Sequence, residues 1–411
     1  MDSGSTAFIL LAAAMVFLMT PGLAFFYGGL GRRKNVINTM MMSIAPIALA
    51  VCLWIICGYS LSFAGQGDFV GNFSHIFFQG VSETESSLGN QISDIAFSAF
   101  QMMFSIIAVA IVTGSVAGRM RFTPLLFFMA GWLLLIYYPL AHMVWGGGLL
   151  AKIGALDFAG GDVVHISSGV TGLVLALAVG RRRDFQRLDY RPHNIPFVLL
   201  GTGLLAFGWF GFNAGSALEA NGAAVHAFMT TILSAAAAMF SWLLLEKALI
   251  GKPSLVGAST GLIAGLVAIT PGAAYVPYWA ALLIGLLVSP VCYFAISVLK
   301  VKLGYDDALD AFGCHGIGGL YGGLMTALFT SPQLTPEAGN YGLFFGSSHL
   351  LLATLAAIAL TLVWSALIAW LLIRLIGMFT PLRVSDRAEA LGLDDSEHEE
   401  TAYPTFMGLD S

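Results

Sequence analysis

The chain has 411 residues, of which 58% are hydrophobic and only 10% are charged. An ordinary soluble domain cannot bury that much apolar surface, so the composition indicates a polytopic membrane protein. The net charge of −5 gives no sign of a nucleic-acid partner, and the 48 glycines favour helices that pack closely through small residues.

Apolar stretches long enough to cross a bilayer follow one another along the whole chain. They cover residues 7–30, 35–64, 95–118, 122–145, 162–180, 195–217, 221–245, two spans within 253–299 that Pro271–Pro277 separates, 308–329 and 343–376. The last is long for one crossing and is expected to tilt. We therefore predict an all-α protein with eleven transmembrane helices, divided into a transmembrane domain (1–380) and a polar, acidic tail (381–411).

The basic residues test this count. If the N-terminus lies outside, every one of the 18 Lys and Arg residues except Lys152 falls in a cytoplasmic segment. A miscount by one span would scramble this segregation. The sequence thus predicts a multi-pass protein of the cell (inner) membrane, with the N-terminus outside and the C-terminus in the cytoplasm.

Two histidines lie inside apolar spans, and each begins the pattern His-x-x-x-Gly-x-x-Gly, at His165 and at His315. An ionisable group is costly in the membrane and usually marks a pathway or a site. Their places in spans five and ten are equivalent in a five-plus-five inverted repeat followed by a final long helix, a common transporter construction. The alternatives are two unrelated histidines, each bonded to a backbone carbonyl, or a metal site, for which two imidazoles make a poor ligand set.

A group of aromatic side chains is predicted at the outer level of three different helices. Span three carries Phe100 and Phe104, span four ends at Trp145, and span six carries Phe212 and Ser216 outward. Aromatic faces attract a cation, and a hydroxyl oxygen can accept a hydrogen bond from it. An aromatic belt at the membrane interface is the alternative interpretation.

Three acids lie near the histidines. Asp157 and Asp162 flank a Gly-rich turn before span five, where a cap at the helix N-terminus is as good an interpretation as a ligand role. Asp310 precedes His315 and is expected to be a cap or a packing partner.

Several motifs, in order, resemble the ammonium transporters of the Amt/Mep/Rh group. They are Thr20–Gly29 (TPGLAFFYGG), Asp157–His165 (DFAGGDVVH), Gly208–Ser216 (GWFGFNAGS), Phe312–Gly316 (FGCHG) and, in the tail, Leu382–Val384 and Gly392–Asp394. The resemblance covers nearly the whole chain. Trp145 and Ser216 favour the Amt branch over the Rhesus branch.

The resemblance implies roles for single residues. Phe104, Trp145 and Ser216 would recruit NH4+, Phe100, Phe104 and Phe212 would form a gate, His165 and His315 would line the pore, and Asp157 would be a structural acid. It also implies a homotrimer in membrane lipid and a cytosolic PII-type partner. The tail reads His398-Glu399-Glu400 where many members of the group have His-Gly-Glu, and this extra acid puts docking of the PII-type partner in question.

The expected function is transport of ammonium, with ammonia or methylammonium as related substrates and with or without net charge movement. The alternatives are a Rhesus-like channel for neutral NH3 or CO2 and an ammonium sensor that acts through a partner. No nucleophile–base set or metal cluster is visible in the sequence, so neither an enzyme nor a cofactor or metal is expected.

Overall fold

The computed structural model describes residues 1–187, 191–335 and 339–403, and its regular elements over these residues are all helical. Ten helices in these ranges are long and apolar enough to span a membrane. The remaining expected span is the continuous helical segment Phe312–Phe329, whose glycines and histidine make it less apolar. The predicted class, an all-α polytopic membrane protein, is confirmed, and the count of eleven agrees approximately.

Five of the spans come from the first half of the chain. They are α1 (Ser3–Leu30); α2, η2 and α3 (Val36–Leu53, Trp54–Gly58, Tyr59–Phe63) after the turn η1 (Arg33–Asn35); α4 with η4 (Asp94–Val112, Thr113–Val116) after the turn η3 (Ile76–Phe78); α5, η5 and α6 (Phe122–Trp132, Leu133–Tyr137, Tyr138–Trp145); and, after the short α7 (Leu149–Lys152), η6 and α8 (Gly161–Ile166, Ser167–Val179).

The second half adds the other spans. They are α9 (Ile195–Gly215); α10 (Gly222–Ile250); α11 with η7 (Leu255–Ile269, Thr270–Gly272); α12, η8 and α13 (Tyr278–Phe294, Ala295–Leu299, Lys300–Leu303); η9 and α14 (Phe312–Gly316, Ile317–Phe329); and, after η10 (Leu343–Phe345), α15 (His349–Phe379). Side-chain caps set several helix starts, as where Asp2 accepts from the Ser5 N–H and Asn194 from the Phe197 N–H.

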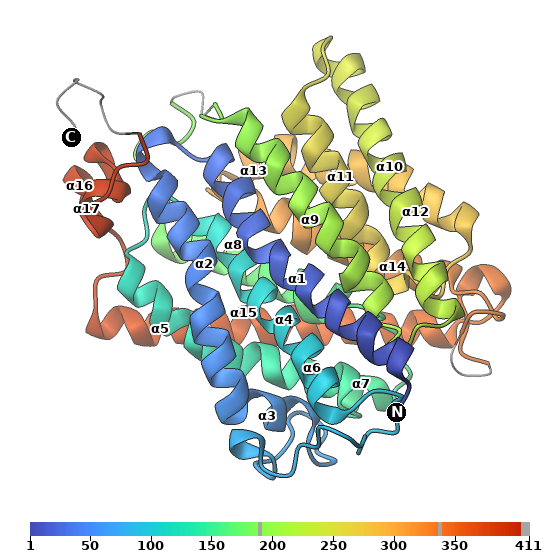
Figure 1. Ribbon diagram of the computed structural model, residues 1–411. Helices are drawn as coiled ribbons and strands as arrows, with labels where there is room; N and C mark the ends of the chain where they lie inside the picture. The colour runs from blue at the N-terminus through green and yellow to red at the C-terminus, as the bar shows by residue number, and fades with distance from the viewer. Residues whose placement is uncertain (188–190, 336–338, 404–411) are drawn as a thin grey trace.

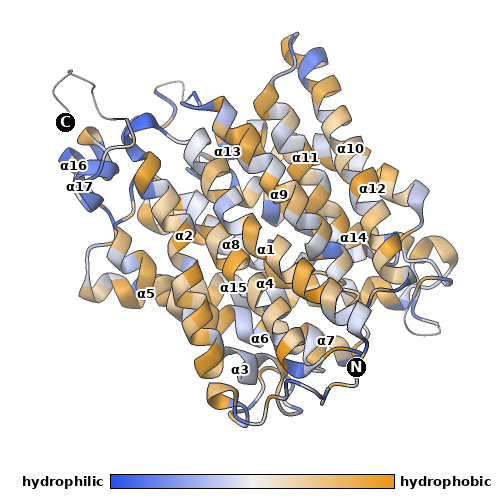
Figure 2. Ribbon diagram, in the orientation of Figure 1, coloured by the Kyte–Doolittle hydropathy of each residue, from blue (hydrophilic) through white to orange (hydrophobic). Residues whose placement is uncertain are grey.

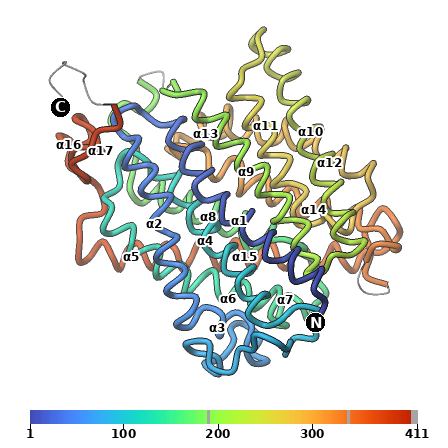
Figure 3. Tube along the Cα trace, in the orientation of Figure 1, coloured from blue at the N-terminus to red at the C-terminus, as the bar shows by residue number. Residues whose placement is uncertain are grey.

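The two halves share a construction. Spans four and five each contain a π-helical turn (η5 and η6), and so do spans nine and ten (η8 and η9). The first helices of the halves, α1 and α9, lie side by side (Figures 1 and 3). Their approach needs glycine, because a Cβ at Gly29 would lie 2.7 Å from the backbone of Asn194 and of Val198. These matches agree with the expected inverted repeat, while the π turn η2 of span two has no counterpart in span seven, α10.

The two ends of the bundle can be told apart by the segments they hold. We call N-side the end with Asp2 and the loop 64–93, which are joined by the hydrogen bond from the Asp2 N–H to the Gln91 carbonyl. We call C-side the end with the tail. Apolar residues dominate the helices between the two ends, and polar residues gather in the loops and the tail (Figure 2).

The tail folds back onto the C-side of the bundle as α16 (Asp386–Leu391) and α17 (Leu393–His398). Glu389 accepts hydrogen bonds from Arg383 and from the Arg183 backbone, and Asp394 accepts one from the Asn38 N–H at 2.9 Å. The described part of the tail is therefore anchored to the transmembrane helices, while residues 404–411 lie outside the described ranges.

Candidate functional site

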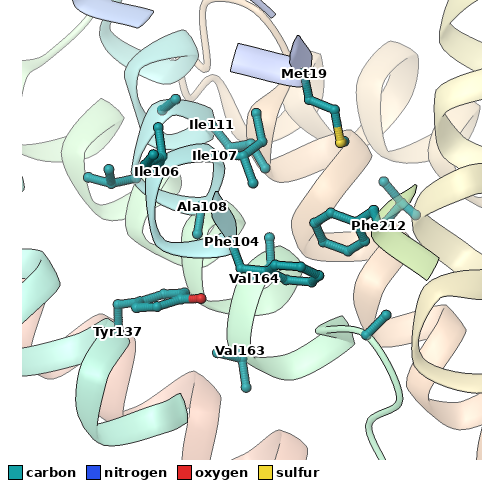
Figure 4. Packing of buried hydrophobic residues seen from close by; sticks show 14 of the residues in the cluster. Met19, Phe104, Ile106, Ile107, Ala108, Ile111, Tyr137, Val163, Val164 and Phe212 are labelled. Carbon is teal, nitrogen blue, oxygen red and sulfur yellow. The ribbon is translucent and has the colours of Figure 1, made fainter. Parts of the chain in front are cut away.

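Two stacked phenylalanine rings close the centre of the bundle. Phe104 of α4 and Phe212 of α9 have ring centroids 4.1 Å apart and planes 26° apart, and both side chains are buried (Figure 4). Phe100, one turn before Phe104, packs edge-on against it at 4.9 Å. Phe100, Phe104 and Phe212, the three rings that the family resemblance predicts as a gate, therefore form one contiguous aromatic layer.

Trp145 lies against this layer at the end of α6. Its ring is 6.1 Å from that of Phe104 and nearly perpendicular to it, at 85°. The indole N–H donates a 2.8 Å hydrogen bond to the Asp157 carbonyl, which fixes the orientation of the ring. Trp145 is only partly buried, whereas Phe104 beneath it is fully buried, so the indole face is the more accessible surface.

Ser216 follows the last turn of α9 and caps it. Its hydroxyl donates to the Phe212 carbonyl at 2.9 Å, which leaves the oxygen lone pairs free to accept a hydrogen bond from a ligand. Ser216 is partly exposed and lies one turn beyond Phe212. The structure thus connects Phe104, Trp145, Phe212 and Ser216 through direct contacts or one helical turn.

Asp157 organises the turn that begins span five. Its carboxylate accepts four backbone hydrogen bonds, from Gly160, Gly161, Asp162 and Val163, at 2.6–3.3 Å. Burial raises the pKa of Asp157, and these N–H donors counteract that rise. The turn also needs Gly160, whose φ of +117° is in the left-handed region. Asp157 is therefore a cap inside the fold, with its side chain committed to the backbone.

Below the phenylalanine layer the two histidines meet. The Nδ1 atoms of His165 and His315 are 3.3 Å apart, and the ring centroids are 5.3 Å apart. One ring can donate and the other accept, which fixes complementary tautomers. Nε2 of His165 is buried and has no partner among the described residues. The pair therefore satisfies one nitrogen of each ring and leaves a polar atom for a third group.

The shared glycine pattern explains how the rings come together. A Cβ at Gly169, four residues after His165, would collide with the backbone of Gly316. A Cβ at Gly319, four residues after His315, would lie 3.1 Å from Cβ of His165 and 3.0 Å from Ile166. Each glycine is thus the place where the other histidine's helix makes its closest approach.

A narrow cavity of about 80 Å³ continues from the histidines toward the C-side. Its walls are mainly apolar, with Met19, Leu23 and Phe26 from α1 on one side. Its polar lining comes from His165, His315, Trp209, Tyr27, Thr260, Cys314 and Asp310. A cavity of this size holds only a few molecules as small as water or ammonia.

The sequence analysis assigned no role of their own to two residues that hold the site. Trp209 stacks on His165 with centroids 5.4 Å apart, and its indole N–H donates to Thr270. Its spacing of three residues from Phe212 on one helix was the available signal. Asp307 lies eight residues before His315, as Asp157 lies eight before His165, and it accepts from the Ala311 and Phe312 N–H groups.

Of the two expectations for Asp310, a cap or a packing partner, the second fits the structure. Asp307 is the cap of η9, whereas Asp310 lines the cavity and forms an ion pair with Lys300. Asp162 belongs to the capped turn, as expected, through its backbone N–H, and one of its carboxylate oxygens is buried without a partner among the described residues.

A bundle of membrane-spanning helices around a small cavity, with an aromatic layer on one side and paired imidazoles inside, is the architecture of a membrane transport protein. The Ammonium Transporter Family model matches residues 7–403, and the chain belongs to that family.

Relatives of similar length lie in distant organisms. The chain is 45% identical to an ammonium transporter of Bacillus subtilis over 99% of this chain and 100% of that protein. It is 42% identical to the ammonium transporter Amt1 of Archaeoglobus fulgidus, over 98% and 100% of the two chains.

Solved structures give the same result. Saccharomyces cerevisiae Mep2 superimposes with a TM-score of 0.87 at 34% identity, covering 94% of this chain and 88% of that one. A structure described as a sensor Amt protein gives 0.89 at 29% identity, covering 96% and 98%.

Proposed function

We propose that the chain takes up ammonium across the cell membrane, from the N-side, which faces outward, to the C-side, which faces the cytoplasm. NH4+ binds first at Phe104, Trp145 and Ser216, where the indole and phenyl faces attract the cation and the Ser216 oxygen accepts one of its hydrogens. The contact chain from Trp145 through Phe104 to Phe212 supports this order of events.

Magnitudes decide what crosses the aromatic layer. A cation–π contact contributes about 2 kcal/mol when desolvated. Taking an unpaired ion into an apolar medium costs on the order of tens of kcal/mol. The aromatic site can therefore hold NH4+ but cannot carry it through the closed layer. The ion transfers its proton to water on the N-side of the layer, and NH3 passes between Phe104 and Phe212.

The single observation that carries the proposal is the pair of imidazoles 3.3 Å apart at the end of the apolar cavity. Neutral NH3 is both donor and acceptor, and Nε2 of His165, which has no described protein partner, can bond to it. K+ has the charge and roughly the size of NH4+ but no proton to release, so it stops at the aromatic layer.

Electrophysiology on a solid-supported membrane tests the proposal, with the purified protein reconstituted in vesicles. Ammonium pulses should give a saturable response and K+ pulses none. A current would show that the proton follows the ammonia, whereas uptake without current would favour the alternative of a neutral NH3 or CO2 channel.

His165→Ala should abolish the current or change its selectivity, because it removes a polar group from the path and leaves His315 without its hydrogen-bond partner. A variant with wild-type current and selectivity would reduce both histidines to packing residues.

The likeness to a sensor Amt protein supports a second function, ammonium sensing through a partner. The proposed assembly is a homotrimer in membrane lipid, with one pore per subunit. A PII-type protein docking on the C-side is the partner to test, since the anchored tail lies on that face. Binding of such a protein that depends on ammonium would support the sensor role.

A further inference from the structure

An ion pair lies at the C-side end of the cavity, where Asp310 is part of the lining. Nζ of Lys300 lies 2.5 Å from Oδ1 of Asp310, with 15% of the lysine side chain and 30% of the aspartate side chain exposed. Asp310 is the one carboxylate among the residues that line the cavity, which it shares with His315 and Thr260. Any cation that forms or enters at this end meets Asp310.

The backbone holds Asp310 in an uncommon conformation. Its φ is +61°, in the left-handed region, which few non-glycine residues adopt and which aspartate tolerates better than most. The next turn, η9, is fixed by the Asp307 cap, so Asp310 cannot relax without disturbing the turn that carries His315.

Lys300 reaches Asp310 because the π turns η8 and η9 pack together. A Cβ at Gly313 of η9 would lie 2.6 Å from the Ile296 side chain of η8, so only glycine permits this approach. Lys300 follows η8 directly, and its ammonium group reaches Asp310, which is part of the cavity lining. The nearby Arg182 is already engaged with Asp306 at 2.6 Å.

We propose that Lys300 is a tethered counter-ion that stops the inner mouth of the cavity from holding a free cation. An unpaired carboxylate in a half-buried site attracts NH4+ or K+, because nearby water screens its charge only partly. The lysine ammonium occupies that carboxylate permanently. NH3 that takes a proton from cytoplasmic water below the histidines then leaves as ammonium, and cytoplasmic K+ finds no site. This inference rests on the proposed transport function and makes Lys300 a positioning residue that sets ion selectivity.

The test removes the lysine charge and keeps its length. Four variants are purified beside the wild type: Lys300→Met, Lys300→Arg, the double variant Lys300→Met/Asp310→Asn and the matched control Lys302→Met. Lys302 lies two residues further along the chain at an exposed position. K+ binding to each is measured by titration calorimetry with KCl against choline chloride at constant ionic strength. Ammonium uptake into vesicles is measured with the same two salts on both sides of the membrane.

The expected result is K+ binding by Lys300→Met alone, with ammonium uptake about fivefold slower in KCl than in choline chloride, the change expected when a partly screened ion pair becomes available. The double variant should lose both effects, since residue 310 no longer carries a carboxylate, and Lys300→Arg should behave as the wild type. A general structural role for Lys300 would lower uptake equally in both salts.

The inference is overturned if folded Lys300→Met neither binds K+ nor responds to it. Lys300→Gln decides in the same way if the methionine variant fails to insert. Failure of the proposed function is a separate outcome: a wild type that takes up no ammonium would remove transport, while the K+ titration would still report whether Lys300 shields Asp310.

Discussion

The segments Asp157–His165 and Asp307–His315 are two versions of one device. In each, an aspartate eight residues before the histidine caps the π turn that carries the imidazole. The Asp157 carboxylate accepts four backbone N–H bonds, whereas Asp307 accepts two. The repeat thus supplies the placement of each histidine, and the surroundings decide how firmly each turn is held.

The surroundings differ in charge as well. The turn after Asp157 touches Trp145 through the Asp157 carbonyl, and among the described residues the Asp157 carboxylate bonds to backbone N–H groups and to no basic side chain. The turn after Asp307 lies beside the Lys300–Asp310 ion pair. One end of the path is therefore suited to attract a cation by aromatic faces, and the other has its charge already neutralised.

The largest expected effect is a difference in stability between substitutions of the two capping residues, Asp157 and Asp307. Asp157→Asn keeps one acceptor oxygen and turns an NH2 group toward two backbone N–H donors, so we expect the free energy of unfolding to fall by about 3 kcal/mol. Asp307→Asn loses one such bond and should cost about 1 kcal/mol. Titration with SDS in mixed micelles measures both, with the exposed Asp68→Asn as control. Equal losses would mean that the number of backbone bonds does not decide how firmly a turn is held.

The second prediction concerns the glycines after each histidine. The methyl group of Gly169→Ala would collide with the backbone of Gly316. The substitution should lower the free energy of unfolding by about 2 kcal/mol and move the two imidazoles apart. Gly319→Ala meets side-chain atoms of Ile166 and His165 at 3.0–3.1 Å and the Gly161 carbonyl oxygen at 3.2 Å, which are milder contacts, so it should cost less than about 1 kcal/mol.

Gly203→Ala is the control for these glycines, because a Cβ there meets nothing within 4 Å. Thermal unfolding and ammonium uptake are measured for all three variants. A Gly169→Ala protein with wild-type stability and uptake would show that α8 and η9 can separate at no cost, and that the shared glycine pattern does not place the histidines.

Much of this architecture could be predicted from the sequence, because hydropathy and the segregation of basic residues depend on single positions. The pairing of His165 with His315 was also within reach, since both begin one pattern. The π turns were not, because they arise from packing between spans that are far apart in the chain. Asp307 was overlooked for a related reason: its eight-residue spacing from His315 means little until the capped backbone is seen.

The tail shows the same limit. Its composition predicted a polar, acidic segment, and the acids proved to be partners of specific groups, as where Glu389 bonds to Arg383 and Asp394 to the Asn38 backbone. Hydropathy cannot distinguish such an anchored segment from a solvated one, because both are polar. Only the positions of the opposing donors on α2 and in the loop after α8 decide it.

The third prediction tests the aromatic side of the comparison. Trp145→Leu removes the indole face and should weaken ammonium binding by about 1–2 kcal/mol, which raises the concentration for half-maximal uptake roughly 5- to 30-fold. The maximal rate and the fold should change little. Trp279→Leu, an N-side tryptophan outside the site, is the matched control. An unchanged half-saturation in Trp145→Leu would exclude the indole from recruitment.

The last prediction uses pH to distinguish the caps. Burial and the neighbouring Asp310 raise the pKa of Asp307 to about 6, from an ordinary value of 3.8. Between these two values the folded chain binds the proton more tightly than the unfolded chain, so ionisation of Asp307 lowers stability at neutral pH, and acid relieves that cost. Relative to Asp307→Asn, which cannot ionise, the wild type should therefore gain about 1 kcal/mol of unfolding free energy from about pH 7 to pH 5. Parallel pH profiles for the two proteins would mean that Asp307 stays ionised across this range and that Lys300 stabilises the whole carboxylate pair instead of Asp310 alone.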